Sequence, residues 1–235
     1  MESGVLRFGS RDIAFQVQRS SRRQTLGISV NSSGVTLIAP AHLEFATILD
    51  LAQRKARWVF QKVRHFETLN FSPAHSKTFE SGESFRYLGR LYRLKRLPFE
   101  GSPSLKLRGA FFEMRAADTR QARDLVEEWY RTRALDRISE RIARYSLRLG
   151  YPTPTILIRD QRQRWGSCSA AGELRFNWRI IMAPMRLVDY VVAHELCHLK
   201  VKGHSRSFWL ALSQLLPDYE ARRDELNVQG QMYSL

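Results

Sequence analysis

The chain has 235 residues, of which 38 are Lys or Arg and 23 are Asp or Glu, so its formal net charge at pH 7 is +15. Hydrophobic residues make up 43% of the chain, which is enough to form a sizeable core and excludes a wholly disordered protein. Two cysteines are too few for a disulfide-dense scaffold or a zinc finger built from cysteine alone.

No run of about 18 apolar residues occurs, so no membrane-spanning helix is expected. The first residues lack a basic stretch followed by an apolar one, so we expect no secretory signal and a cytoplasmic protein without a membrane partner. The positive charge favours an anionic partner such as nucleic acid or a nucleotide. A solvated basic surface explains the same charge equally well.

The first half of the chain has the short alternating segments typical of strands. From about 44 to 66, apolar residues recur at helical spacing and predict one helix. Two hairpins are expected around Gly89 and Gly109. The other predicted strands are 13–17, 26–30 and 35–38. Residues 1–117 are therefore predicted to form a β-rich module with one helix.

The second half opens with a long helical pattern that Asp118 or Thr119 can cap and that Gly150 ends. Two strands are expected at 155–158 and 174–177, followed by helices at 186–201, 205–216 and 218–226. We predict an α+β protein in two parts, with a helical domain and a small sheet over 118–235.

One predicted helix contains the motif His194-Glu195-Leu196-Cys197-His198. Histidines four residues apart lie on one face of a helix, with Cβ atoms about 6 Å apart, so both rings can reach one metal ion. Glu195 is turned roughly 100° around the helix and can reach a water at the metal without ligating it. An apolar helix makes these groups costly to bury unless something such as a bound cation compensates them.

The third ligand is predicted to be His204, provided that the helix ends before it. Gly203 can end the helix and turn the chain back, and Ser205 can cap the next helix. Three neutral imidazoles leave a fourth position open, as in catalytic zinc sites. We therefore expect one Zn²⁺ per chain, which lowers the pKa of its water, and Glu195 as the general base. The remaining histidines are interpreted as surface residues: His42, His65 and His75.

The segment from Arg162 to Ser169 precedes this helix and has two interpretations. It is either a wall of the active site or a hairpin loop, turned at Gly166, with Trp165 packed in the core. Arg164 and Trp165 are candidate substrate-binding residues, as is Arg206 beyond the motif.

Both cysteines lie near the predicted metal site. We interpret Cys197 as a small buried hydrophobe. A Cys168 thiolate that fills the open metal position would make a latent, redox-sensitive form, which is a separate hypothesis. Phe208 and Trp209 are expected to pack in the core.

Four segments of the chain together resemble the YgjP-like metallopeptidase family, a bacterial group of metal-dependent hydrolases related to the SprT-like and WLM zinc proteases. The segments are Arg164-Trp165-Gly166-Ser167-Cys168-Ser169, Phe176-Asn177-Trp178-Arg179, the stretch Asp189 to His198, and His204-Ser205 with Phe208-Trp209. Residues 19–23 and the Gly89 hairpin also look like the front half of that family. The resemblance implies a zincin-like C-terminal domain, the metal ligands His194, His198 and His204, and the catalytic residue Glu195.

Three functions stay open. The first is a zinc peptidase that acts on a protein or peptide substrate, with the basic first half available to anchor nucleic acid. The metzincin form of this hypothesis is weaker because Val201 stands where that group has glycine. The second is a hydrolase of nucleotide phosphoanhydride or phosphodiester bonds, with Arg162, Arg164 and Arg206 on the phosphates. Three histidines suit Zn²⁺ better than the Mg²⁺ common in such enzymes. The third is a nucleic-acid-binding protein with a non-catalytic metal, for which Glu195 would have no use.

Overall fold

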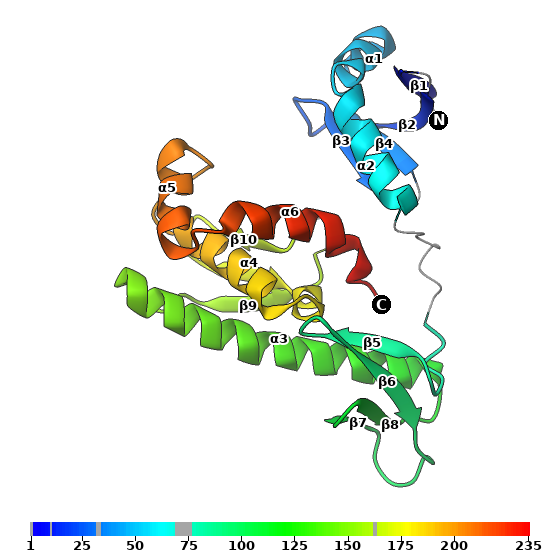
Figure 1. The fold of residues 1–235 in the computed structure, drawn as a ribbon, viewed down its shortest axis with the longest axis vertical. Helices are drawn as coiled ribbons and strands as arrows, with labels where there is room; N and C mark the ends of the chain where they lie inside the picture. Colours follow the sequence, from blue (N-terminus) through cyan, green and yellow to red (C-terminus); the bar gives the residue numbers. More distant parts are fainter. Residues whose placement is uncertain (1, 10, 32–33, 69–76, 162–163) are drawn as a thin grey trace. The chain divides into compact units, whose positions relative to one another are not determined.

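The computed structural model describes residues 2–9, 11–31, 34–68, 77–161 and 164–235, except for the side chains of 31, 65–68 and 231. The chain forms two compact units, Met1–His75 and Ser76–Leu235 (Figure 1). Both contain strands and helices, which confirms the α+β class, and the second contains the predicted helices with a small sheet. Within the described residues, no helix is both long and apolar enough to cross a membrane.

The first unit is built on a four-stranded sheet with the order β1-β2-β4-β3. Two antiparallel hairpins supply the strands, and β2 and β4 join the hairpins in parallel. On β2, Ile13, Phe15 and Val17 are buried while their neighbours are exposed, so one face of the sheet carries the core. The strands are β1 (Glu2–Phe8), β2 (Arg11–Ser20), β3 (Gly27–Asn31) and β4 (Gly34–Pro40).

Two helices cover the buried face of this sheet, α1 (Phe45–Gln53) and α2 (Ala56–Thr68) (Figure 1). The prediction of a single helix over 44–66 is wrong. The Lys55 N–H donates to the Ala52 carbonyl, three residues earlier, at 2.9 Å, whereas the N–H groups of an α-helix donate to carbonyls four residues earlier. The helix axis breaks at this tighter turn. The break lets Ile48 on α1 and Val59 on α2 both reach the core of the unit.

The second unit begins with another four-stranded sheet, in the order β5-β6-β8-β7. The predicted hairpins around Gly89 and Gly109 are confirmed, and both glycines have positive φ, 81° and 56°. In the turn of the first hairpin, the Leu88 N–H donates to the Ile181 carbonyl and the Gly89 N–H donates to the Met182 carbonyl. The strands are β5 (Ser84–Tyr87), β6 (Arg90–Arg96), β7 (Ser104–Arg108) and β8 (Phe111–Arg115).

The long helix α3 (Thr119–Leu149) packs on this sheet. Its predicted ends are confirmed, because the Asp118 carboxylate accepts the Gln121 N–H and Gly150 closes the helix with a φ of 64°. The Tyr130 hydroxyl donates to the Arg86 carbonyl at 2.5 Å. The sheet and α3 share one core, so the two compact units divide at residues 75 and 76, whereas the sequence predicts a boundary near 117.

The rest of the unit combines a small sheet with three helices. β11 lies in the middle of the sheet, parallel to β9 and antiparallel to β10. The sequence predicts β9 and β11 but leaves β10 within a loop. The elements are β9 (Ile156–Arg159), β10 (Gly166–Cys168), β11 (Leu174–Asn177), the 3₁₀ helix η1 (Trp178–Met182), α4 (Met185–Cys197), α5 (Arg206–Leu215), α6 (Tyr219–Gln229) and the 3₁₀ helix η2 (Gly230–Met232).

Candidate metal centre

The helix α4 that carries the motif is almost wholly buried, from Leu187 to Cys197. It packs against α3, α5, α6 and β10. Asp189 is a buried charged residue of α4 outside the motif, and Arg141 on α3 pairs with it, with 2.8 Å between the Arg Nε and an Asp carboxylate oxygen. Both side chains are largely buried, so this ion pair links α4 to α3 inside the core.

Three histidines converge where α4 ends. The last residue of the helix is Cys197, four residues before the predicted end, and Gly203 then takes a φ of 77°. This turn brings His204 back to His194 and His198, as predicted, and one ring nitrogen from each residue lies within 4.8 Å of the others. The Nε2 atoms of His194 and His204 are 3.0 Å apart. Among the described residues these three form a group of His, Cys, Asp or Glu that could hold a metal ion.

The ring chemistry of the three histidines fits a metal ion. The Nδ1 of His198 lies 3.1 Å from the Val201 carbonyl, so it carries the proton and leaves Nε2 free as a ligand. Burial, followed by the charges of His198 and His204, lowers the pKa of His194 to about 3. Partial burial and His198 also lower the pKa of His204. The rings of His194 and His204 are therefore neutral at pH 7, the form that binds metals.

Two aromatic side chains at the start of α5 support the triad. Phe208 is fully buried, as expected, and stacks on His198 with ring centroids 4.5 Å apart. Trp209 stacks on the exposed His204 at 5.5 Å, and its Nε1–H donates to the His204 carbonyl at 3.1 Å. From the sequence, Trp209 is expected only to pack in the core. Its position five residues after His204, on the next helix, is the signal that could have indicated this contact.

Glu195 is buried, with 5% of its surface exposed. Burial raises the pKa of Glu195 to about 8, and the nearby positive charge of Arg164 acts in the opposite direction. A Cβ atom at Gly166 would lie only 2.7 Å from both the Cγ and an Oε of Glu195. Gly166 begins β10, so its role is a close approach of the strand to Glu195 and not the tight turn that the sequence predicts.

The candidate substrate-binding residues lie in different surroundings. Arg164 is exposed and close enough to Glu195 for its charge to act there. Trp165 is half-buried and packs on Tyr233 with ring centroids 6.0 Å apart. This contact agrees with the interpretation in which Trp165 packs in the core. Arg206 is exposed at the first turn of α5, and Arg162 lies outside the described residues. Substrate binding by these residues stays a prediction.

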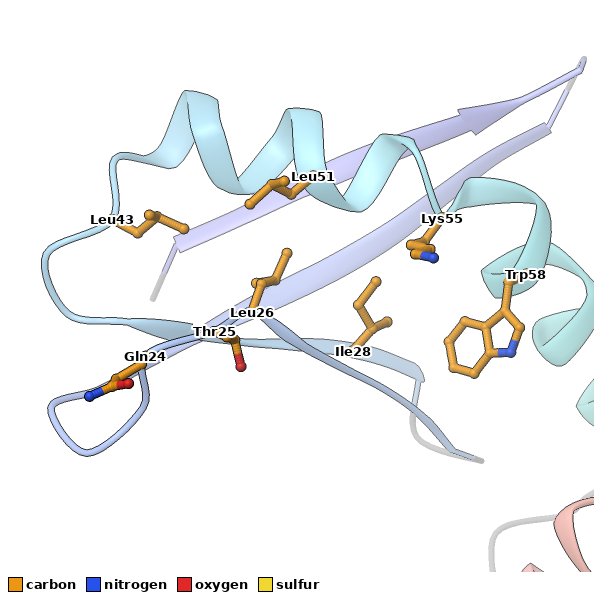
Figure 2. A pocket seen from close by; sticks show the side chains of 8 residues that line it. All are labelled: Gln24, Thr25, Leu26, Ile28, Leu43, Leu51, Lys55 and Trp58. Carbon is orange, nitrogen blue, oxygen red and sulfur yellow. The ribbon is translucent and has the colours of Figure 1, made fainter. Parts of the chain in front are cut away.

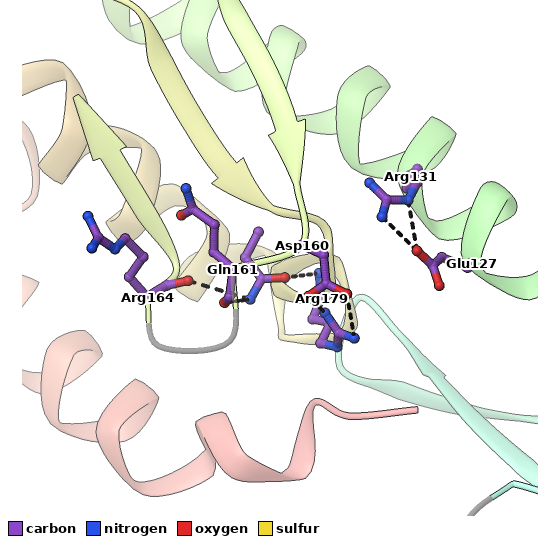
Figure 3. Close-up of polar contacts among 7 residues, drawn as sticks. Glu127, Arg131, Asp160, Gln161, Arg164 and Arg179 are labelled. Atoms are coloured by element: carbon purple, nitrogen blue, oxygen red, sulfur yellow. Dashed lines mark hydrogen bonds and ion pairs between the residues drawn. The ribbon is translucent and has the colours of Figure 1, made fainter. Parts of the chain in front are cut away.

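The backbone around Arg164 is held by Asn177, which is buried at the end of β11. The Asn177 amide donates to the Gln161 carbonyl at 2.7 Å and to the Arg164 carbonyl at 3.4 Å. Figure 3 shows Gln161 and Arg164, with Gln161 close to the ion pair of Asp160 with Arg179. The sequence does not indicate this role of Asn177, because its partners are backbone groups more than ten positions away.

The other candidates lie outside the triad. Cys168 is half-buried, and burial and the charge of Glu195 both raise the pKa of its thiol, which disfavours a thiolate. Cys197 is buried and its pKa is raised to about 11. His42 is exposed, and the side chains of His65 and His75 lie outside the described residues.

The chain is similar to one family model and to solved structures of two archaeal proteins. The family model described as YgjP-like, metallopeptidase domain, matches residues 24–229, which include every residue of the triad. The crystal structure of the metallopeptidase zymogen of Pyrococcus abyssi abylysin is 23% identical, with a TM-score of 0.36, and the match covers 38% of this chain and 90% of that one. The corresponding zymogen structure of Methanocaldococcus jannaschii jannalysin is 23% identical, with a TM-score of 0.35, over 40% and 96% of the two chains. No curated protein matches the chain.

Proposed function

The chain belongs to the YgjP-like metallopeptidase family, and from this premise we propose that it is a zinc-dependent peptidase with His194, His198 and His204 as metal ligands and Glu195 as the proton acceptor. The observation that carries the proposal is the meeting of three imidazoles beside one buried carboxyl group. Three imidazoles with an open position are the donor set of catalytic zinc sites.

A zinc ion held by these ligands supplies Lewis acidity, which activates water near pH 7 and polarises a peptide carbonyl. Glu195 accepts the proton of the attacking water and delivers it to the nitrogen of the departing peptide. Burial raises the pKa of Glu195 to about 8, and the positive charge of a bound metal ion would favour its carboxylate, the form that accepts a proton. Gly166 and the β10 backbone limit where the Glu195 side chain can go.

The small sheet supports an extended peptide as the substrate. β10 is at the edge of the sheet, and its first residue lies against Glu195. An extended chain can add to such an edge through backbone hydrogen bonds, which are independent of sequence. A substrate strand beside β10 would therefore place a peptide bond close to Glu195 and the triad.

The test measures metal content and turnover together. Wild type and the Glu195→Gln variant are purified without a histidine tag, their metals are quantified by mass spectrometry, and both are assayed on unfolded casein and on a panel of nucleotides. We expect about one zinc per chain in both proteins and at least about a hundredfold loss of casein cleavage in Glu195→Gln. Nucleotide hydrolysis that is lost in the same variant would replace the proposal with a phosphohydrolase. Zinc in both proteins with no cleavage by either would assign the site a structural role.

A further inference from the structure

The first unit has an apolar groove between the edge strand β3 and the helices α1 and α2 (Figure 2). Its volume is about 670 Å³, within the range of roughly 300–1,000 Å³ that binding pockets occupy. Figure 2 shows Leu26 and Ile28 on one wall and Leu51 and Trp58 on the other, with the space between them open. The remaining lining residues are Gln24, Thr25, Leu43 and Lys55.

The helical wall of the groove exposes large apolar side chains. Trp58 is 42% exposed and Leu51 is 37% exposed, although the core of the same unit is fully buried around Ile48 and Val59. Burial of apolar surface contributes about 25 cal/mol per Å², and a partly exposed tryptophan in a groove is the usual anchor of a protein contact. These two side chains therefore favour an apolar occupant.

The opposite wall is the edge of a sheet. Within the described residues, β3 pairs with β4 and has no strand on its other side. Alternate backbone groups of an edge strand point away from the sheet and can pair with a further strand. A strand added there would direct every second side chain toward α1 and α2, which is where the apolar groove lies.

The charge around the groove favours an acidic occupant. Lys55 is the one charged residue among those that line it. The Arg23 guanidinium lies against Gly27, the first residue of β3. Residues 1–75 contain ten Lys and Arg against five Asp and Glu, a net +5.

We propose that this groove binds an extended segment of a partner protein, which adds as a strand to β3. The segment has apolar side chains at alternate positions, which enter the groove, and acidic side chains near Lys55 and Arg23. The segment lies along β3 beside Ile28, which lines the groove. This interaction surface is additional to the proposed peptidase site and does not depend on it.

The test uses the full chain and a fluorescein-labelled octapeptide in which leucine alternates with glutamate. Binding is measured by fluorescence anisotropy. We expect Trp58→Ala and Leu51→Ser each to weaken binding at least about tenfold, the usual effect of removing an anchor residue. Leu147→Ser is the matched control, since Leu147 is 84% exposed on α3, and it should leave binding unchanged. Thermal melting of each variant verifies that the protein is folded.

Two further measurements test the backbone pairing with β3 and the charge preference separately. Methylation of alternate backbone nitrogens of the peptide should abolish binding, because the methylated strand cannot pair with β3. Lys55→Glu should weaken binding of the glutamate peptide and strengthen binding of a peptide in which lysine replaces glutamate. Failure of wild type to bind at 1 mM peptide, equal binding of the methylated peptide, or equal binding by Trp58→Ala would each overturn the proposal. Self-association of wild type that Leu51→Ser removes would instead assign the groove to a second copy of the chain.

Discussion

The chain contains two four-stranded sheets with the same topology, and they differ in what covers them. In β1-β2-β4-β3 and in β5-β6-β8-β7, two hairpins are joined by a parallel pair between the second strand of each. The first sheet is followed by two short helices and encloses its own core around Leu6, Leu37 and Ile48. The second is followed by the 31-residue α3, and its core continues into α4 and the metal centre.

The side chains of the two sheets differ accordingly. An aromatic cluster joins the second sheet to α3: the ring centroids of Phe112 and Trp129 are 4.7 Å apart, and those of Tyr87 and Trp129 are 4.9 Å apart. The first sheet is filled mainly by aliphatic residues and leaves Trp58 exposed. The same strand arrangement therefore has a core of its own in one case and shares the core of α3 and α4 in the other, and the helices that follow the two sheets differ accordingly.

The largest expected effect comes from the buried ion pair in the second unit. Arg141→Met leaves the Asp189 carboxylate without its closest partner and should lower the free energy of unfolding by about 3–5 kcal/mol. Urea unfolding followed by circular dichroism measures the change. Arg133→Met is the matched control, because Arg133 pairs with Asp136 at the surface and should contribute less than about 1 kcal/mol. Equal effects of the two substitutions would contradict a structural role for the buried pair.

A matched pair of core substitutions tests whether the two cores act separately. Ile48→Ala in the first unit and Ile138→Ala in the second each empty a fully buried site, and each should cost about 2–5 kcal/mol of stability. Because α4 belongs to the second core, we expect Ile138→Ala to reduce zinc retention and Ile48→Ala to leave it unchanged. Zinc content after dialysis, together with urea unfolding, measures both effects. A loss of zinc in Ile48→Ala would show that the cores are coupled.

Gly166→Ala tests the close approach of β10 to Glu195. The added methyl group would lie 2.7 Å from the Glu195 side chain and must displace it. A displacement of about 1 Å in a catalytic group can cost a hundredfold in rate, so we expect that loss of casein cleavage with zinc content unchanged. Steady-state kinetics and metal analysis measure the two quantities. A fully active Gly166→Ala protein would show that the position of Glu195 is not limited by this strand.

The smallest effect is expected for Trp209→Phe. Phenylalanine retains a ring beside His204 but removes the hydrogen bond from Nε1 to its carbonyl, so the third ligand is held less firmly. We expect the zinc Kd to rise about tenfold, as for other groups that orient metal ligands. Competition with a zinc chelator measures the Kd. Trp58→Phe, on the exposed surface of the first unit, is the control and should leave the Kd unchanged.

Interactions between residues close in sequence account for most of what could be predicted. The spacing of His194, His198 and His204 and the turn at Gly203 are local features, and the structure brings the three rings together as expected. The caps of α3 at Asp118 and Gly150 are local in the same way. β1 was missed because its residues do not alternate clearly between apolar and polar, and the break between α1 and α2 because the apolar pattern continues through it.

The amino-acid sequence by itself determined the helical motif, its third histidine and the α+β class, since periodicity and turn residues act over a few positions. Only the tertiary structure decided that β10 lies against Glu195, that Arg141 pairs with Asp189, that Trp209 holds His204 and that the strands after residue 76 share a core with α3. The first three are individual side-chain contacts and the last is a shared core, and no local pattern encodes which distant surfaces meet. Chain folding brings them together through the packing of buried faces.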